Sequence, residues 1–144
     1  MTVSPIPAGY PRVSPYLIVD DADGTLAFML RVFDGESLRR HTTPDGRIMH
    51  AEVRLGDAVV MVGAAGPEWP AVPAALHIYV TNADETYRRA VAAGAVTVTE
   101  PTTQPYGDRS AYVRDVSGTT WFISTHVEDV SDEELARRMS GGAR

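Results

Sequence analysis

The stretch Ala75-Leu76-His77-Ile78-Tyr79-Val80-Thr81-Asn82-Ala83-Asp84 decides the fold, because the chain contains a second copy of its pattern. The earlier copy is Ser14-Pro15-Tyr16-Leu17-Ile18-Val19-Asp20-Asp21-Ala22-Asp23, and Val19 aligns with Val80 at an offset of 61 residues, which is 80 minus 19. In each copy a short apolar run precedes turn residues and a helical pattern, which predicts a strand, a cap and a helix. Two copies within 144 residues predict a duplicated module.

The composition is that of a globular protein and narrows the classes of partner. Apolar residues make up 44% of the chain and the net charge is −6. Nucleic acids and anionic membranes need a basic surface, so we expect neither as a partner. The chain has no cysteine, which excludes disulfides and cysteine-ligated metals. No apolar run reaches the ~18 residues of a membrane span, and the first residues lack a signal-peptide pattern, so we expect a cytoplasmic protein.

The first module is predicted to span residues 12–64, after an N-terminal arm of residues 1–11. Its pattern predicts a strand over 13–19, a helix capped by Asp23 and ended by Gly35, and strands over 36–41, 48–55 and 58–62. Thr43-Pro44-Asp45-Gly46 is typical of a hairpin turn. Residues 65–73, rich in Gly, Pro and Ala, form the predicted linker.

The second module, residues 74–127, repeats this order. We expect a strand over 75–80, a helix capped by Asp84, and strands over 96–99, 110–114 and 120–125. Residues 101–109 are expected to form a loop, and residues 128–144 a C-terminal helix and tail, with Ser131 and Glu134 as a capping box.

The fold class that follows is α+β, with two β-α-β-β-β modules. A four-stranded mixed sheet covered by one helix leaves its other face open, and two such modules can bring their open faces together around a cavity. The pairing of modules within one chain or between two chains stays open. Because such sheets leave edge strands, we expect a homodimer.

At this point the sequence resembles the vicinal oxygen chelate superfamily, which includes glyoxalase I, bleomycin-resistance proteins and extradiol dioxygenases, and most of all its PhnB-like members. The stretches that carry the resemblance are Pro15–Asp21, Pro44–Glu52, Tyr106–Arg109, Arg114–Trp121 and Thr125–Ser131. The resemblance covers roughly residues 12 to 139 and is specific for fold and superfamily, but weak for the reaction.

The resemblance also implies where a metal would bind, because metal-using relatives take ligands from the start of the first strand and from the last strand of each module. These positions fall at Ser14, at Ala75, at Val60 or Met61, and at Phe122. Alanine, valine, methionine and phenylalanine side chains do not bind a hard divalent cation. We therefore predict no metal at the usual position, although a shift of two residues would bring His77 there and leaves a displaced metal site open.

The remaining polar residues form the candidate ligand site. Strand alternation puts a common set of side chains on the sheet faces opposite the helices, and we expect them to line one pocket, with Trp69 at its mouth. The predicted ligand-binding residues are Tyr16, His50, Glu52, Trp69, His77, Tyr79 and Tyr112. A solvated polar strand face is the alternative for His50 and Glu52, and a buried core histidine is the alternative for His77.

Three functions are consistent with these features. The first, which we favour, is a small-molecule-binding protein without the usual metal, comparable to bleomycin-resistance proteins. The second is a divergent lyase, isomerase or dioxygenase-type enzyme that uses shifted metal ligands or metal-free acid–base catalysis through a His–Glu pair. The third is a structural or regulatory dimer. The catalytic residues and the ligand itself are not specified by the sequence, since a fold does not fix a function.

Overall fold

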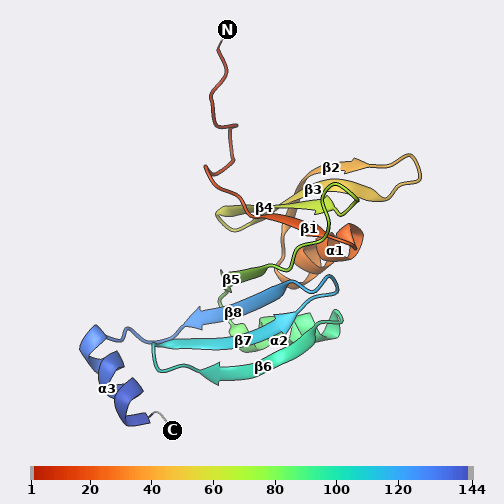
Figure 1. Ribbon diagram of the computed structural model, residues 1–144. Helices are drawn as coiled ribbons and strands as arrows, with labels where there is room; N and C mark the ends of the chain where they lie inside the picture. The colour runs from red at the N-terminus through yellow and green to blue at the C-terminus, as the bar shows by residue number, and fades with distance from the viewer. Residues whose placement is uncertain (1, 143–144) are drawn as a thin grey trace. The chain divides into compact units, whose positions relative to one another are not determined.

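The computed structural model describes residues 2–142, which divide into two compact units (Figure 1). The first unit comprises the chain up to Ala74 together with residues 116–118, and the second comprises the rest. Among the residues described, no helix is long and apolar enough to cross a membrane.

The first unit contains one four-stranded sheet and one helix. Its elements, in chain order, are β1 (Tyr16–Val19), α1 (Ala22–Val32), β2 (Glu36–Thr42), β3 (Ile48–Leu55) and β4 (Ala58–Ala64). The strand order is β1-β4-β3-β2, with β1 parallel to β4 and the other pairs antiparallel.

The second unit repeats this topology. Its elements are β5 (Ala75–Tyr79), α2 (Ala83–Ala92), β6 (Val96–Thr103), β7 (Asp108–Arg114), β8 (Thr120–His126) and α3 (Asp132–Gly142). The strand order is β5-β8-β7-β6, again with one parallel pair, β5 and β8. The predicted α+β class with two β-α-β-β-β modules is confirmed.

Each sheet packs one face against its own helix. Helix α1 contacts β1, β3 and β4, and helix α2 contacts β6, β7 and β8 (Figure 1). Period-2 alternation in the strands and the apolar stripe on each helix supply the buried side chains. The buried apolar residues include Leu17, Val19, Leu26, Met29, Ala51, Val53 and Val62 in the first unit, and Ala90, Ala111, Val113, Trp121 and Ile123 in the second.

Both helix caps lie two residues before the predicted ones. The Asp21 side chain accepts from the Gly24 backbone N–H at 2.9 Å, and the Asn82 side chain accepts from the Glu85 N–H at 3.1 Å. The predicted caps, Asp23 and Asp84, lie inside the first helical turn, where a carboxylate is favourable for the helix dipole.

Several strands are longer than predicted, among them β4 and β6. Strand β4 continues to Ala64, so that Gly63, which follows the predicted strand over 58–62, lies within the sheet and pairs with Ile18 and His50. Strand β6 continues to Thr103 and includes Pro101, which an edge strand tolerates because one side of its backbone has no partner strand. Strand β1 is shorter than predicted and begins only at Tyr16.

Candidate functional site

The open face of the first sheet carries two rows of side chains that the register aligns across the strands. Tyr16, Met61 and Glu52 are directly opposite one another on β1, β4 and β3. Ile18, Gly63 and His50 form the next row. Because directly paired residues project to the same face, both rows lie opposite α1. This agrees with the predicted alternation on β3, where Ala51 and Val53 are fully buried.

Because Gly63 has no side chain, the Tyr16 ring can extend over the neighbouring row on the same face of the sheet. A Cβ atom built on Gly63 would lie 2.8 Å from both Cε1 and the hydroxyl oxygen of Tyr16. The ring therefore occupies the space that any larger residue would fill. In this position its hydroxyl lies 3.1 Å from His50 Nδ1, and the two ring centroids are 5.6 Å apart.

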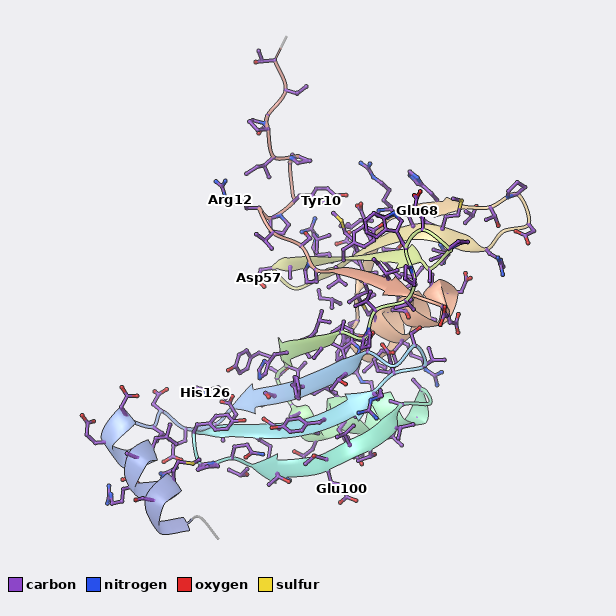
Figure 2. The ribbon with its side chains drawn as sticks, in the orientation of Figure 1. Tyr10, Arg12, Asp57, Glu68, Glu100 and His126 are labelled. Carbon is purple, nitrogen blue, oxygen red and sulfur yellow. The ribbon has the colours of Figure 1, made fainter. Side chains whose placement is uncertain are left out.

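His50 links Tyr16 to a buried carboxylate. Its Nε2 atom is 2.8 Å from Glu52 Oε2, and the other carboxylate oxygen, Oε1, accepts from the Tyr10 hydroxyl. Tyr10, which Figure 2 labels, belongs to the N-terminal segment that leads into β1. Side chains from the arm, β3 and β1 thus form one hydrogen-bonded chain, Tyr10–Glu52–His50–Tyr16.

The electrostatics of this chain keep Glu52 ionised. Glu52 is only 5% exposed, and burial alone would raise the pKa of its carboxyl group. The hydrogen bonds from His50 and Tyr10 outweigh that burial and hold the pKa below its usual value. The bond to Glu52 in turn raises the pKa of the Tyr10 phenol. Arg39 contributes weakly, since its Nε is 4.0 Å from Glu52 Oε1 and its side chain is largely exposed.

A pocket of about 430 Å³ adjoins these hydrogen-bonded side chains within the first unit. Its lining residues are Tyr16, Ile18, Met49, Gly63, Ala64 and Trp69. Three of the large side chains are more than half exposed: Tyr16 at 52%, Met49 at 55% and Trp69 at 65%. Exposed aromatic and thioether groups around a hollow are typical of a surface that buries an apolar ligand.

The second sheet carries its own group on the face opposite α2. His77, Phe122 and Tyr112 form one cross-strand row, and the adjacent row begins with Tyr79. The Tyr112 and Phe122 centroids are 4.8 Å apart, and those of His77 and Tyr79 are 4.7 Å apart. His77 Nε2 is 3.1 Å from the Ser124 hydroxyl, so His77 is an exposed, hydrogen-bonded residue and not a sealed core histidine.

A second carboxylate lies at the end of this face. Asp108 is 4% exposed and accepts from the Tyr79 hydroxyl at 3.1 Å and from His126 Nδ1 at 2.9 Å. His126 Nε2 lies 2.7 Å from Asp129 Oδ1. The hydrogen bonds to Asp129 and then to Asp108 raise the pKa of His126, and the bond to Asp108 raises the pKa of Tyr79. Figure 2 labels His126 at the end of β8.

The predicted site residues therefore fall into two groups. Tyr16, His50 and Glu52 are joined by hydrogen bonds, and Trp69 lines the same pocket as Tyr16. His77, Tyr79 and Tyr112 lie together on the second sheet. That the two groups line one common pocket stays a prediction.

Sequence reasoning missed several residues of the site. Tyr10 lies in a proline-rich arm without periodicity, Gly63 falls just after the predicted strand over 58–62, and Asp108 falls in the predicted loop over 101–109. Strict alternation would place Met49 on the same face as Ala51 and Val53, so its position in the pocket lining could not be found from that pattern. The register between β2 and β3 shifts at Met49, where His41 pairs with His50 but Thr42 pairs with Ile48. Arg109 pairs with Asp84 on α2 through two hydrogen bonds of 3.0 Å, which lower the pKa of Asp84.

The metal positions that the family implies do not fit a divalent cation here. The residue opposite Phe122 is His77, and the residue opposite Ala75 is Thr120. In the first unit the corresponding first-strand and last-strand pair is Tyr16 and Met61. Across residues 2–142 no group of three or more His, Cys, Asp or Glu side chains is placed to hold a metal.

Comparison with known proteins identifies the family. Residues 10–123 match the Glyoxalase/Bleomycin resistance protein/Dioxygenase superfamily, and the chain belongs to this superfamily. The "Uncharacterized protein Mb0911c" of Mycobacterium bovis is 33% identical over 141 residues, which cover 90% of this chain and 93% of that protein.

Two solved structures are similar as well. TioX from Micromonospora sp. ML1 superposes with a TM-score of 0.70 at 28% identity and covers 81% of this chain and 99% of its own. A glyoxalase-related enzyme from Fulvimarina pelagi has a TM-score of 0.65 at 20% identity, covering 79% and 87% of the two chains. The second likeness concerns the fold alone.

Proposed function

We propose that this chain is a small-molecule-binding protein of the bleomycin-resistance type, which holds a planar, partly aromatic ligand without the usual metal. The observation that carries the proposal is the pocket of about 430 Å³ on the open face of the first sheet. Trp69, Tyr16 and Met49 offer it large apolar surfaces that a flat ligand would cover. The PhnB-like placement within the superfamily belongs to this proposal and rests on the motifs quoted above.

A direct test uses 2-methylnaphthalene, which is flat, apolar and small enough for the pocket. Calorimetric titration should detect binding, and the amide signals of Gly63 and Ala64 should shift in NMR spectra. Replacing Trp69 by alanine removes one wall, so Trp69→Ala should weaken binding about tenfold. The matched control is Val72→Ala, which changes an exposed apolar residue of the same segment that does not line the pocket. Equal binding by wild type and Trp69→Ala, or no binding up to the solubility limit of the probe, contradicts the proposal.

A second candidate function is metal-free acid–base catalysis. It is favoured by the His50–Glu52 pair, in which a buried carboxylate orients an imidazole at 2.8 Å. In that function Tyr16 or the imidazole would exchange a proton with the ligand. Elemental analysis of the purified protein separates this candidate from an enzyme with displaced metal ligands, because stoichiometric Zn, Mn, Ni or Fe would support the latter.

A further inference from the structure

The buried carboxylate of Glu52 determines which groups donate and which accept along the four hydrogen-bonded side chains. Ionised Glu52 has only acceptor atoms, so both of its partners must donate. Tyr10 therefore donates its hydroxyl proton to Oε1, and His50 donates Nε2–H to Oε2. In a neutral imidazole the other nitrogen, Nδ1, is then an acceptor.

Tyr16 is the next member and its role follows. His50 Nδ1 lies 3.1 Å from the Tyr16 hydroxyl. Because Nδ1 is an acceptor, the Tyr16 hydroxyl donates its hydrogen bond to it. The Tyr16 oxygen is left with lone pairs and no proton to offer. This oxygen lies above Gly63, and both residues line the pocket.

We propose that the chain Tyr10–Glu52–His50–Tyr16 makes the pocket selective for a planar aromatic ligand that carries a hydrogen-bond donor, such as a phenol or a ring N–H. The inference rests on the proposed function and adds the ligand's polar group to it. A donor on the ligand satisfies the Tyr16 oxygen. A ligand that offers only an acceptor leaves two facing oxygens unpaired, which is unfavourable. Tyr10 and Glu52 are positioning residues here, since they act through His50.

Tyr10 has a distinct part in this arrangement. It comes from the arm, where Gly9 takes a φ of +83° and the Tyr10 N–H donates to the Pro7 carbonyl at 3.1 Å, so a turn precedes the phenol. By occupying Oε1 it leaves only Oε2 to His50. The N-terminal arm thus completes the polar end of the site.

The test compares three naphthalene probes that differ only at position 2. The hydroxyl of 2-naphthol donates, the oxygen of 2-methoxynaphthalene only accepts, and the methyl group of 2-methylnaphthalene does neither. All three titrations are made at the same pH, and the ¹⁵N shifts of His50 show which of its ring nitrogens carries a proton. Wild type should bind 2-naphthol about two- to tenfold more tightly than 2-methylnaphthalene, and 2-methoxynaphthalene no more tightly than 2-methylnaphthalene.

Glu52→Gln should reverse the direction of the chain. The amide oxygen still accepts from Tyr10, which turns the amide N–H₂ toward His50 Nε2. His50 then carries its proton on Nδ1 and donates to Tyr16, whose hydroxyl becomes free to donate to the ligand. This variant should prefer 2-methoxynaphthalene over 2-methylnaphthalene, and the ¹⁵N shifts of His50 should report the opposite tautomer. Adding Tyr10→Phe removes the group that orients the amide and should erase that preference.

The outcomes separate the two proposals. If 2-methylnaphthalene does not bind the pocket, the proposed function fails. If it binds, but wild type shows no donor preference or Glu52→Gln leaves preference and tautomer unchanged, the donor inference is wrong. Should Glu52→Gln not fold, Tyr16→Phe decides. It removes the accepting oxygen and keeps the ring, so 2-naphthol should lose its advantage over 2-methylnaphthalene in this variant. A persisting advantage overturns the inference.

Discussion

Gly63 shows at the scale of one residue how a missing side chain shapes this site. Its role is steric: a Cβ there would stand 2.8 Å from the Tyr16 ring. Because the colliding group is the end of a side chain, Gly63→Ala should displace the ring and not the backbone. We expect binding of 2-methylnaphthalene to fall about tenfold, while the free energy of unfolding changes by about 1 kcal/mol or less.

Calorimetric titration and urea unfolding check this prediction, with Gly66→Ala as the matched control. A Cβ on Gly66 meets open space, so that variant should bind the probe like wild type. Unchanged affinity in Gly63→Ala would show that the Tyr16 ring does not depend on this glycine.

The sequence predicted that His50 and Glu52 share a face, because alternation alone decides it. The role of Gly63 could not be predicted from the sequence, because it depends on Tyr16, a partner 47 residues away, which is 63 minus 16.

At the scale of elements, the sequence repeat predicts more than element order. The row Tyr16–Met61–Glu52 in one sheet has its counterpart in His77–Phe122–Tyr112 in the other. The repeat predicted the order of elements in each module, and periodicity predicted which strand faces are buried. They did not fix where strands and helices begin, because both caps depend on which of several polar side chains the backbone presents to the first helical turn.

The segment after β8 is an element whose attachment should depend on pH. His126 bridges Asp129 and Asp108, and these contacts raise its pKa. A raised folded-state pKa gives stability that is fully present below the unfolded-state value of about 6.5 and is lost as the pH rises through the folded-state pKa. The urea midpoint of wild type should therefore exceed that of His126→Gln by the largest amount at about pH 6. The difference between the two midpoints should shrink toward about pH 9.

Asp129→Asn supplies the control for this prediction. It removes the first of the two carboxylates and leaves the buried Asp108 in place. The titration midpoint of His126, followed by NMR, should fall in this variant without reaching that of a free imidazole. A difference between wild type and His126→Gln that stays constant with pH would mean that His126 stabilises the fold by packing and not by its charge.

At the scale of the whole molecule, the two sheets differ in how they protect their edges. Strand β2 borders only β3 and carries Arg39 and Arg40, charges that discourage pairing with another chain. Strand β6 borders only β7 and begins with Val96-Thr97-Val98-Thr99, without a charge. Val96 is 63% exposed and Val98 is 45% exposed. This uncharged, β-branched half of β6, before Glu100 and Pro101, is the kind of edge that adds to a second sheet.

We propose that the expected homodimer forms by pairing of β6 with β6 of a second copy, since closed two-fold pairs are the commonest assemblies. Sedimentation velocity at micromolar concentration should then show a dimer. Val98→Lys places a charge on each of the two facing edges, so it should shift the population to monomer without loss of fold. Val127→Lys is the matched control, because Val127 is 55% exposed but lies outside β6. A monomeric wild type contradicts the dimer, and a Val98→Lys variant that stays dimeric assigns the contact to another surface.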